Sequence, residues 1–378
     1  LAPGPTPLLP EAIMEMGRPI IHHRTPEFVS ILAAVREDLK YLFQTENDVL
    51  LLCSSGTGAM EGAVTNFLSP GDKALVVRAG KFGERWGELC QAYGVEVEAI
   101  DLPWGHSVDP QEIAARLQQH PEIKAVFVQS SETSTGARHD VQAIGEIVRR
   151  YERTILVVDA ISSLGAFPVQ TDAWGLDVVV TCSQKALMLP PGLGMVSVSQ
   201  KAWGLAEEAR LPKYYFNFQK ERKALAKNEN AFTPAVSLIM GLQEVLREIR
   251  QEGLETIFAR HDLLARATRA AIAALGLQLY ARDDPSPSLT AVEVPPGVDG
   301  SAIPKMMRDE YGITIAGGQD RAKGKIFRIV HVGYVDRFDI VTAVAALEMV
   351  LQRLGWPVTF GRGVGAALEV LSRGDGER

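Results

Sequence analysis

Three features of the sequence can do chemistry together that none can do alone: a loop of small residues, a carboxylate and a lysine. The loop, Ser54–Met60, opens a helical pattern, and the free backbone N–H groups at a helix start can hold a phosphate. The carboxylate of Asp159 can pair with a protonated pyridine nitrogen and keep that ring an electron sink. Lys185 lies in an apolar stretch, where burial lowers the pKa of an amine and makes it a useful nucleophile.

Each feature also has a more ordinary interpretation. The glycines of the loop fit a plain tight turn, or an imperfect NADP-binding fingerprint in which Gly62 comes one place late and Arg78 faces a 2′-phosphate. Asp159 alone is typical of a helix cap or a buried pair, and Lys185 alone is typical of a surface lysine. The combination is more specific, because a phosphate loop, a carboxylate and a lysine at the ends of different strands are the three fixed points that pyridoxal phosphate (PLP) needs.

The elements that position these residues are short apolar runs that alternate with helical patterns. Seven runs resemble strands: Val49–Leu52, Ala74–Val77, Val95–Ile100, Ala125–Val128, Ile155–Val158, Val178–Thr181 and Met195–Val198. Continuous apolar strands that alternate with helices predict an α/β fold with a mostly parallel sheet covered on both faces. Ligands bind beyond the carboxyl ends of the strands in such a sheet, and the loop, Asp159 and Lys185 all fall there.

The chain is expected to divide into an N-terminal arm (1–14), a large domain (15–250) and a small C-terminal α+β domain (251–378). The stretch to about Arg24 is rich in proline and is expected to be irregular. A long helical pattern, Val236–Leu275, is expected to leave the large domain. The small domain is predicted from short strands and helices at Leu277–Tyr280, Leu289–Val294, Ser301–Tyr311, Phe327–Ile329, Asp336–Leu354 and Val364–Leu371.

Composition and charge narrow the classes of function. The 378 residues are 46% apolar and 22% charged, as is usual for a soluble globular protein. A net charge of -7 favours neither nucleic acid nor an anionic membrane surface as a partner. The cysteines, Cys53, Cys90 and Cys182, form no CxxC pair, so we expect no metal site and no disulfide framework, and a cytoplasmic compartment fits best. No secretory signal and no membrane-spanning run is recognised.

A series of short segments extends the PLP interpretation over nearly the whole chain. They are, in order, Pro3–Pro7, His23–Phe28, Ser55–Gly58, Glu132–Gly136, Val158–Gly165, Ser183–Leu187, Pro190–Gly192, Thr233-Pro234 and Ile315–Gly318. In these segments the sequence resembles class V (fold type I) PLP-dependent aminotransferases, and specifically the alanine–glyoxylate / serine–pyruvate aminotransferase family. The resemblance implies the fold type I architecture and the transfer of an amino group between alanine or serine and glyoxylate or pyruvate.

The resemblance also implies roles around the cofactor. Lys185 would carry PLP as a Schiff base and shuttle a proton on and off the substrate, and Asp159 would pair with the pyridine nitrogen. The other contacts would come from Thr57, Gly58, Ala59 and Gln184 at the phosphate, from Phe82 on the ring face and from Thr133 beside O3′. Phe82, where many relatives carry tryptophan, is also typical of a core residue at a helix start.

The substrate site and the subunit interface are implied in the same way. Arg328 would grip the substrate carboxylate, because a planar guanidinium offers two parallel hydrogen bonds. Gly4 and Thr6 would line the substrate site. Thr233 would reach the cofactor phosphate of the neighbouring subunit, which makes the enzyme a homodimer with shared active sites.

The sequence departs from its relatives near Thr233. Asn230 stands where mammalian-type relatives carry a tyrosine, so the contact from the partner would be weaker or different, and the Tyr214-Tyr215 pair could cover the site instead. Relatives with similar motifs also act on aspartate or on 2-aminoethylphosphonate. A phosphonate would need a cationic pocket, for which the His-His-Arg segment 22–24 is a candidate, although this segment also fits a solvated turn.

Other reactions have less support in the sequence. A cysteine desulfurase or lyase of the same class would need a nucleophilic cysteine late in the chain, and no cysteine follows Cys182. Some relatives of the family have been labelled subunits of a soluble hydrogenase, but metal redox chemistry would require clustered cysteine ligands. An NADP-binding oxidoreductase remains a rival interpretation of the loop at 55–62.

Overall fold

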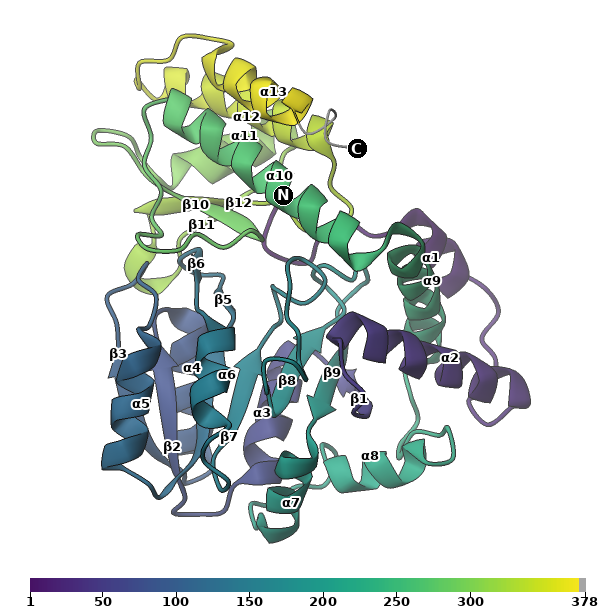
Figure 1. Ribbon diagram of the computed structural model, residues 1–378. Coiled ribbons are helices and arrows are strands. Elements are labelled where there is room, and N and C mark those ends of the chain that lie inside the picture. The colour runs from purple at the N-terminus through teal and green to yellow at the C-terminus, as the bar shows by residue number, and fades with distance from the viewer. Residues whose placement is uncertain (374–378) are drawn as a thin grey trace.

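All seven predicted strands of the large sheet are present in the computed structural model, which describes residues 1–373 (Figure 1). They are β1 (Val49–Ser54), β2 (Lys73–Arg78), β3 (Glu96–Asp101), β4 (Ile123–Gln129), β7 (Ile155–Asp159), β8 (Val178–Cys182) and β9 (Gly192–Val198). Their order across the sheet is β1-β9-β8-β7-β4-β2-β3. Strand β9 runs antiparallel to both of its neighbours, β1 and β8, and the other four pairings are parallel, so the prediction of a mostly parallel sheet is confirmed.

Helices cover both faces of the large sheet because successive residues of its strands point to opposite sides. Leu75 and Val77 of β2 pack in one apolar cluster, and Ala74 and Val76 pack in the other. The first cluster includes residues of α2 (Pro26–Phe43), α5 (Pro110–Gln119), α6 (Val141–Val148) and α9 (Val236–Glu252). The second includes residues of α3 (Gly56–Phe67), α4 (Lys81–Ala92), α7 (Gln200–Glu208) and α8 (Phe218–Leu225).

A smaller antiparallel sheet, in the order β10-β12-β11, packs with the last helices of the chain (Figure 1). Its strands are β10 (Leu289–Glu293), β11 (Ala316–Gly317) and β12 (Ile326–Val330). The helices are α10 (Leu254–Ala274), α11 (Ala302–Tyr311), α12 (Arg337–Arg353) and α13 (Arg362–Arg373), with the 3-10 turn η1 (Asp320–Ala322). A two-stranded hairpin, β5 (Ser131–Glu132) with β6 (Ala137–Arg138), lies between the two larger sheets in Figure 1. The α/β architecture with a small α+β part is therefore confirmed.

Three predicted elements were wrong. The segment expected to be irregular contains a helix, α1 (Pro10–Met16), which begins at a proline and packs against α9. The segment Leu277–Tyr280 is not a strand, because it makes a single bridge between Leu279 and Val292. The long pattern Val236–Leu275 is two helices, because Gly253 between them adopts φ +80 and breaks the helix. The domain boundaries remain a prediction, and position 250 lies in the last turn of α9.

No helix within residues 1–373 is long and apolar enough to cross a membrane.

Candidate active site

The phosphate loop, Asp159 and Lys185 meet at the carboxyl ends of strands of the large sheet. Asp159 is the last residue of β7, and Lys185 lies three residues beyond the end of its neighbour β8. Gly56, within the predicted loop, is the first residue of α3. A Cβ atom on Gly56 would lie 2.5 Å from Cδ1 of Ile161 and 3.4 Å from Cβ of Cys182, so the start of α3 presses against the segments that follow β7 and β8. The three features therefore share one site.

Asp159 is a buried carboxylate with little compensation from the protein. Its side chain is 5% exposed, and its Oδ1 accepts a hydrogen bond of 2.8 Å from the backbone N–H of Ile161. Burial raises the pKa of Asp159 to about 7, and the negative charge of Glu132 acts in the same direction. The hydrogen bond and the positive charges of Lys185 and Arg85 oppose this shift. A further cation beside the carboxylate would favour its ionised form.

Lys185 is the complementary case of a partly buried cation. Burial lowers the pKa of its amine, and the positive charges of Arg328 and Arg85 add to this effect, whereas Cys182 and Asp159 oppose it. The Nζ atom donates a hydrogen bond to the backbone oxygen of Pro3. A lysine in such surroundings loses its proton more easily than an exposed one and can act as a nucleophile or base.

The N-terminal arm crosses over Lys185. Gly4 has φ +124, and a Cβ atom there would lie only 2.7 Å from Nζ of Lys185. Thr6 makes two hydrogen bonds to the segment that carries Lys185. Its N–H donates to the backbone oxygen of Gln184 (3.2 Å), and its Oγ1 donates to the backbone oxygen of Lys185 (2.7 Å). The arm is also tied to the small sheet, because its first carbonyl accepts from Val330 N of β12 at 3.0 Å. It therefore brings Gly4 and Thr6 to Lys185.

Thr57, Gly58 and Ala59, the residues predicted to contact a phosphate, lie in the first turn of α3. Its N-cap residue, Ser55, makes no side-chain cap hydrogen bond. Gly58 has no room for a side chain, because a Cβ atom would lie 1.9 Å from Oγ of Ser54. Gln184 is nearby in sequence to Lys185, and its Oε1 is buried without a partner among the described residues. A helix start with small residues suits an anion, because its first N–H groups have no acceptor within the helix.

Arg85 is a residue that the sequence prediction missed. Its Nη1 donates to Oγ1 of Thr57 (3.2 Å), and its guanidinium lies over the ring of Phe82, 4.9 Å from the ring centroid. It also contributes positive charge to Asp159 and Lys185. Arg85 follows Phe82 by three residues on α4, and that helical spacing could have indicated that the two share a face.

Glu132 was also missed, and it organises the other side of the site. It is fully buried on β5, and its carboxylate accepts from the N–H groups of Phe82 (3.1 Å), Gly83 (3.0 Å) and Ser134 (3.1 Å) and from Oγ of Ser134 (2.5 Å). Burial raises its pKa, and these hydrogen bonds oppose the shift. Glu132 thus fixes the first turn of α4, and with it Phe82, to the β5–β6 hairpin.

Arg328 on β12 is buried beside the same hairpin. Its Nη1 donates to the oxygen of Thr133 (2.8 Å), while Nη2 and Nε donate to the oxygen of Gly317 (2.8 and 3.1 Å). Two of its five N–H bonds keep no partner within residues 1–373, one on each terminal nitrogen. Burial lowers its pKa to about 10, so the guanidinium still carries its charge at neutral pH. The side chain of Thr133 is hydrogen-bonded to Ser162 (2.8 Å).

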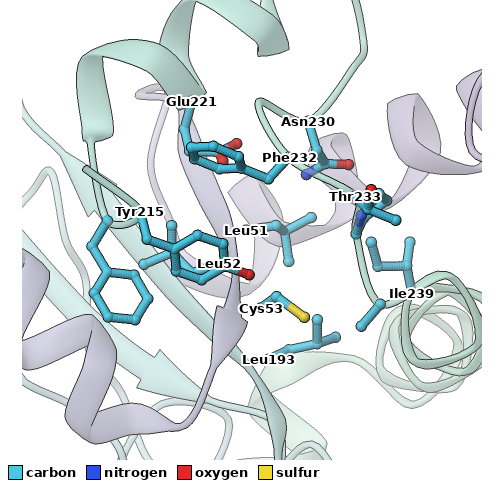
Figure 2. A pocket seen from close by; sticks show the side chains of 13 residues that line it. Leu51, Leu52, Cys53, Leu193, Tyr215, Glu221, Asn230, Phe232, Thr233 and Ile239 are labelled. Carbon is cyan, nitrogen blue, oxygen red and sulfur yellow. The ribbon is translucent and has the colours of Figure 1, made fainter.

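Thr233 lies in a different pocket, which Figure 2 shows together with Asn230, Tyr215 and Cys53. Thr233 is exposed, and Oδ1 of Asn230 is buried without a partner among the described residues. The Tyr215 ring packs against that of Phe232, with centroids 5.1 Å apart. Tyr215 therefore shares a pocket with Thr233. The role of Thr233 toward a second subunit stays a prediction.

The segment 22–24 lies on the surface. The rings of His22 and His23 stack with centroids 4.6 Å apart, and Arg24 pairs with Glu229 at 3.2 Å. No group of three or more histidine, cysteine or acidic side chains that could hold a metal ion occurs in the described part of the chain.

Comparison with known proteins decides the family. The model of the family "Aminotransferase class-V" matches residues 14–344. The chain belongs to the class V aminotransferases. Members of this family generally use PLP, and the structure has the fold type I architecture that the resemblance implied.

Three individual relatives illustrate the range of names in this family. The soluble hydrogenase small subunit of Synechococcus sp. (strain PCC 6716) is 49% identical, with 98% of each chain covered. The serine–glyoxylate aminotransferase of Hyphomicrobium methylovorum is 39% identical, with 98% of this chain and 94% of the relative covered. The crystal structure of ureidoglycine–glyoxylate aminotransferase from Bacillus subtilis aligns with a TM-score of 0.94 at 30% identity, covering 98% of this chain and 97% of that one.

The raised pKa of Asp159 predicts how the stability of the cofactor-free protein depends on pH. The folded-state pKa, about 7, exceeds the ordinary value of 3.8 for an aspartate, so ionisation of this buried carboxyl opposes folding. Its contribution to stability is therefore fully present below about pH 3.8 and is lost as pH rises through about 7. Urea unfolding at a series of pH values should show that Asp159→Asn lacks this loss between about pH 3.8 and 7. An unchanged pH profile in the variant would contradict the assignment.

Glu132→Gln tests the fixing of α4 to the hairpin. The carboxylate of Glu132 accepts from N–H and O–H groups on both of its oxygens. In glutamine one of these oxygens becomes an NH2 group, which cannot accept, so we expect a loss of about 1–3 kcal/mol in the free energy of unfolding. Denaturant unfolding measures this loss. Glu207→Gln, at an exposed position of α7, is the control and should change stability by less than about 0.5 kcal/mol. Equal effects of the two substitutions would refute the role of Glu132.

Proposed function

We propose that this protein is a PLP-dependent aminotransferase that moves an amino group between a small amino acid, alanine or serine, and a 2-oxo acid, glyoxylate or pyruvate. The observation that supports this most is the placement of Asp159 and Lys185. Two adjacent buried strands bring a carboxylate with a raised pKa and an amine with a lowered pKa to one site. Within residues 1–373 neither of them forms an ion pair, since Asp159 accepts one hydrogen bond from the backbone of Ile161 and Lys185 donates one to the backbone of Pro3.

The residues present fit PLP. The protonated pyridine nitrogen would give Asp159 the cation that it lacks. The phosphate would take the start of α3 at Thr57–Ala59, with the Arg85 guanidinium beside it, and the side-chain amide of Gln184 would donate to it through Nε2. Phe82, held at its backbone by Glu132, would lie against the ring, and Thr133 would lie at the O3′ side.

When bound, PLP supplies an electron sink for the electron pair of a bond to the substrate Cα atom. The protein residues would do the rest. Lys185 would hold the cofactor covalently at rest, and its amine, released when substrate binds, would take the proton from Cα and return it. Asp159 would keep its neighbouring nitrogen protonated. The arm at Pro3–Thr6 would cover Lys185 and exclude water.

Arg328 would bind the carboxylate that amino acid and oxo acid substrates share. Its two spare N–H bonds, one on each terminal nitrogen, suit a bidentate contact, and its hydrogen bonds to Thr133 and Gly317 would fix the plane of the guanidinium. Burial strengthens this contact because water competes less for the charges. The preference for a small side chain is supported by the closeness of Gly4 to Lys185 and by the names of the serine–glyoxylate aminotransferases among the relatives.

We also propose a homodimer in which Thr233 faces the cofactor phosphate of the partner subunit. This is supported by the exposure of Thr233 and by the exposed aromatic side chains of Tyr214 and Tyr215 on the same side. The hydroxyl of Tyr215 would then take the place of the tyrosine that Asn230 replaces. A hydrogenase-associated role, suggested by the name of one relative, finds no favourable observation in the placement of the cysteines, of which two are buried and one is exposed.

A half-reaction screen tests the function. The purified holoenzyme is mixed in turn with alanine, serine, aspartate and 2-aminoethylphosphonate, and the visible absorption of bound PLP is followed. We expect alanine or serine to bleach the band at the lowest concentrations, and we expect Lys185→Ala to lose both the band and the reaction. If no amino acid bleaches the band, the protein binds PLP but does not transaminate. A colourless protein that binds NADPH would overturn the whole proposal.

A further inference from the structure

A second cleft, of about 340 Å³, lies where the end of β4 meets the β5–β6 hairpin and the loop before β10. Its lining includes Ser130, Arg138, His139, Phe167, Trp174 and Asp284. None of the residues assigned above to PLP or its substrate lines this cleft. Its volume lies in the range of pockets for small molecules.

Two buried hydrogen-bond donors of the lining residues have no partner among the described residues. His139 is 1% exposed, and its Nδ1 accepts a hydrogen bond of 3.0 Å from the N–H of Val108, so Nδ1 carries no proton. Burial lowers the pKa of His139 to about 4, which leaves the ring neutral with its proton on Nε2, and this Nε2 is unpartnered. Oγ of Ser130, also 1% exposed, is likewise unpartnered. Buried donors without acceptors cost free energy, which a ligand could recover.

Positive charge reaches the same cleft. Nε of Arg138 donates to Oδ2 of Asp284 at 2.7 Å, and its two terminal amino groups have no hydrogen bond within residues 1–373. Helix α6 begins two residues after His139, and Gln142 in its first turn lines the cleft. The acidic groups nearby are already engaged, since Asp284 pairs with Arg138 and Oδ1 of Asp140 caps α6 at Ala143 N (3.0 Å).

The buried unsatisfied groups are therefore donors, and Phe167, Pro168 and Trp174 give the cleft an apolar side. The Cζ atom of Arg138 lies 5.8 Å from the centroid of the Phe167 ring, and Pro168 and Trp174 also line the cleft. A ligand with a negatively charged hydrogen-bond acceptor and an apolar body would match both the donors and the apolar side chains. We propose that this cleft is a second binding site, specific for a small carboxylate with an apolar side group.

The position of this site connects it to both parts of the chain. The backbone N–H of Ser130 donates to the oxygen of Asp159 at 2.9 Å, and Arg138 ends the hairpin that carries Glu132 and Thr133. The other wall comes from Asp284, in the loop that leads to the small sheet. A carboxylate there would contact the hairpin beside the active site and the loop that leads into the small sheet, which carries Arg328.

Isothermal titration calorimetry of the holoenzyme with phenylacetate tests the proposal. Phenylacetate has no amino or oxo group, so it cannot be transaminated. We expect saturable binding that Ser130→Ala weakens by about tenfold, as the loss of one hydrogen bond to a carboxylate implies. Arg138→Gln should weaken the binding further. The matched control is Ser197→Ala, which removes another buried and unpartnered hydroxyl, outside the cleft, and should leave the affinity unchanged.

Two further measurements keep the outcomes distinct. The thermal unfolding midpoint and the visible absorption of the two serine variants should match those of the wild type, because neither hydroxyl has a partner to lose within residues 1–373. The proposal is overturned if phenylacetate does not bind, or if it binds with equal affinity to the wild type and to Ser130→Ala. Binding that competes with alanine and is insensitive to Ser130→Ala would place the carboxylate at Arg328 and would also overturn it.

Discussion

The structure of the site depends on one constraint, the burial of opposite charges at the ends of neighbouring parallel strands. Strands β7 and β8 are buried along their whole length, so the residues at their ends have few ways to reach water. Asp159 and Lys185 each lose hydration there, which raises the pKa of the carboxyl, lowers the pKa of the amine and so favours the neutral form of each. A group that is cationic at one end and reactive toward an amine at the other would reverse both penalties, which is why these two residues together are more informative than either alone.

The surrounding elements can be understood as supports for that pair. The arm ties β12 to the loop of Lys185 through hydrogen bonds at Val330 and Thr6. The hairpin carries Glu132, which fixes the start of α4, and Thr133, whose carbonyl orients Arg328. The small sheet contributes to the site through these specific hydrogen bonds, and its Leu289 and Val330 also pack in the same apolar cluster as α2 and α9. Movement of these elements would change the position of Arg328 relative to Lys185.

The sequence could predict the large sheet because its strands are buried on both faces and hence appear as continuous apolar runs. It could place Asp159 and Lys185 because residues at the ends of parallel strands share one edge. It could not reveal Glu132, because the N–H groups that make a buried carboxylate tolerable come from Phe82 and Gly83, about fifty residues away. Helix α1 was missed because seven residues give little periodicity, and its stability comes from packing against α9.

The family is established, and the names of its members differ widely, so the cofactor site carries more information about this chain than any single relative does. Borohydride reduction of the holoenzyme, followed by mass spectrometry of its peptides, tests the central claim most directly, because it fixes PLP to the lysine that holds it. The account predicts a phosphopyridoxyl group on Lys185. A modification at another lysine, or no modification at all, would contradict it.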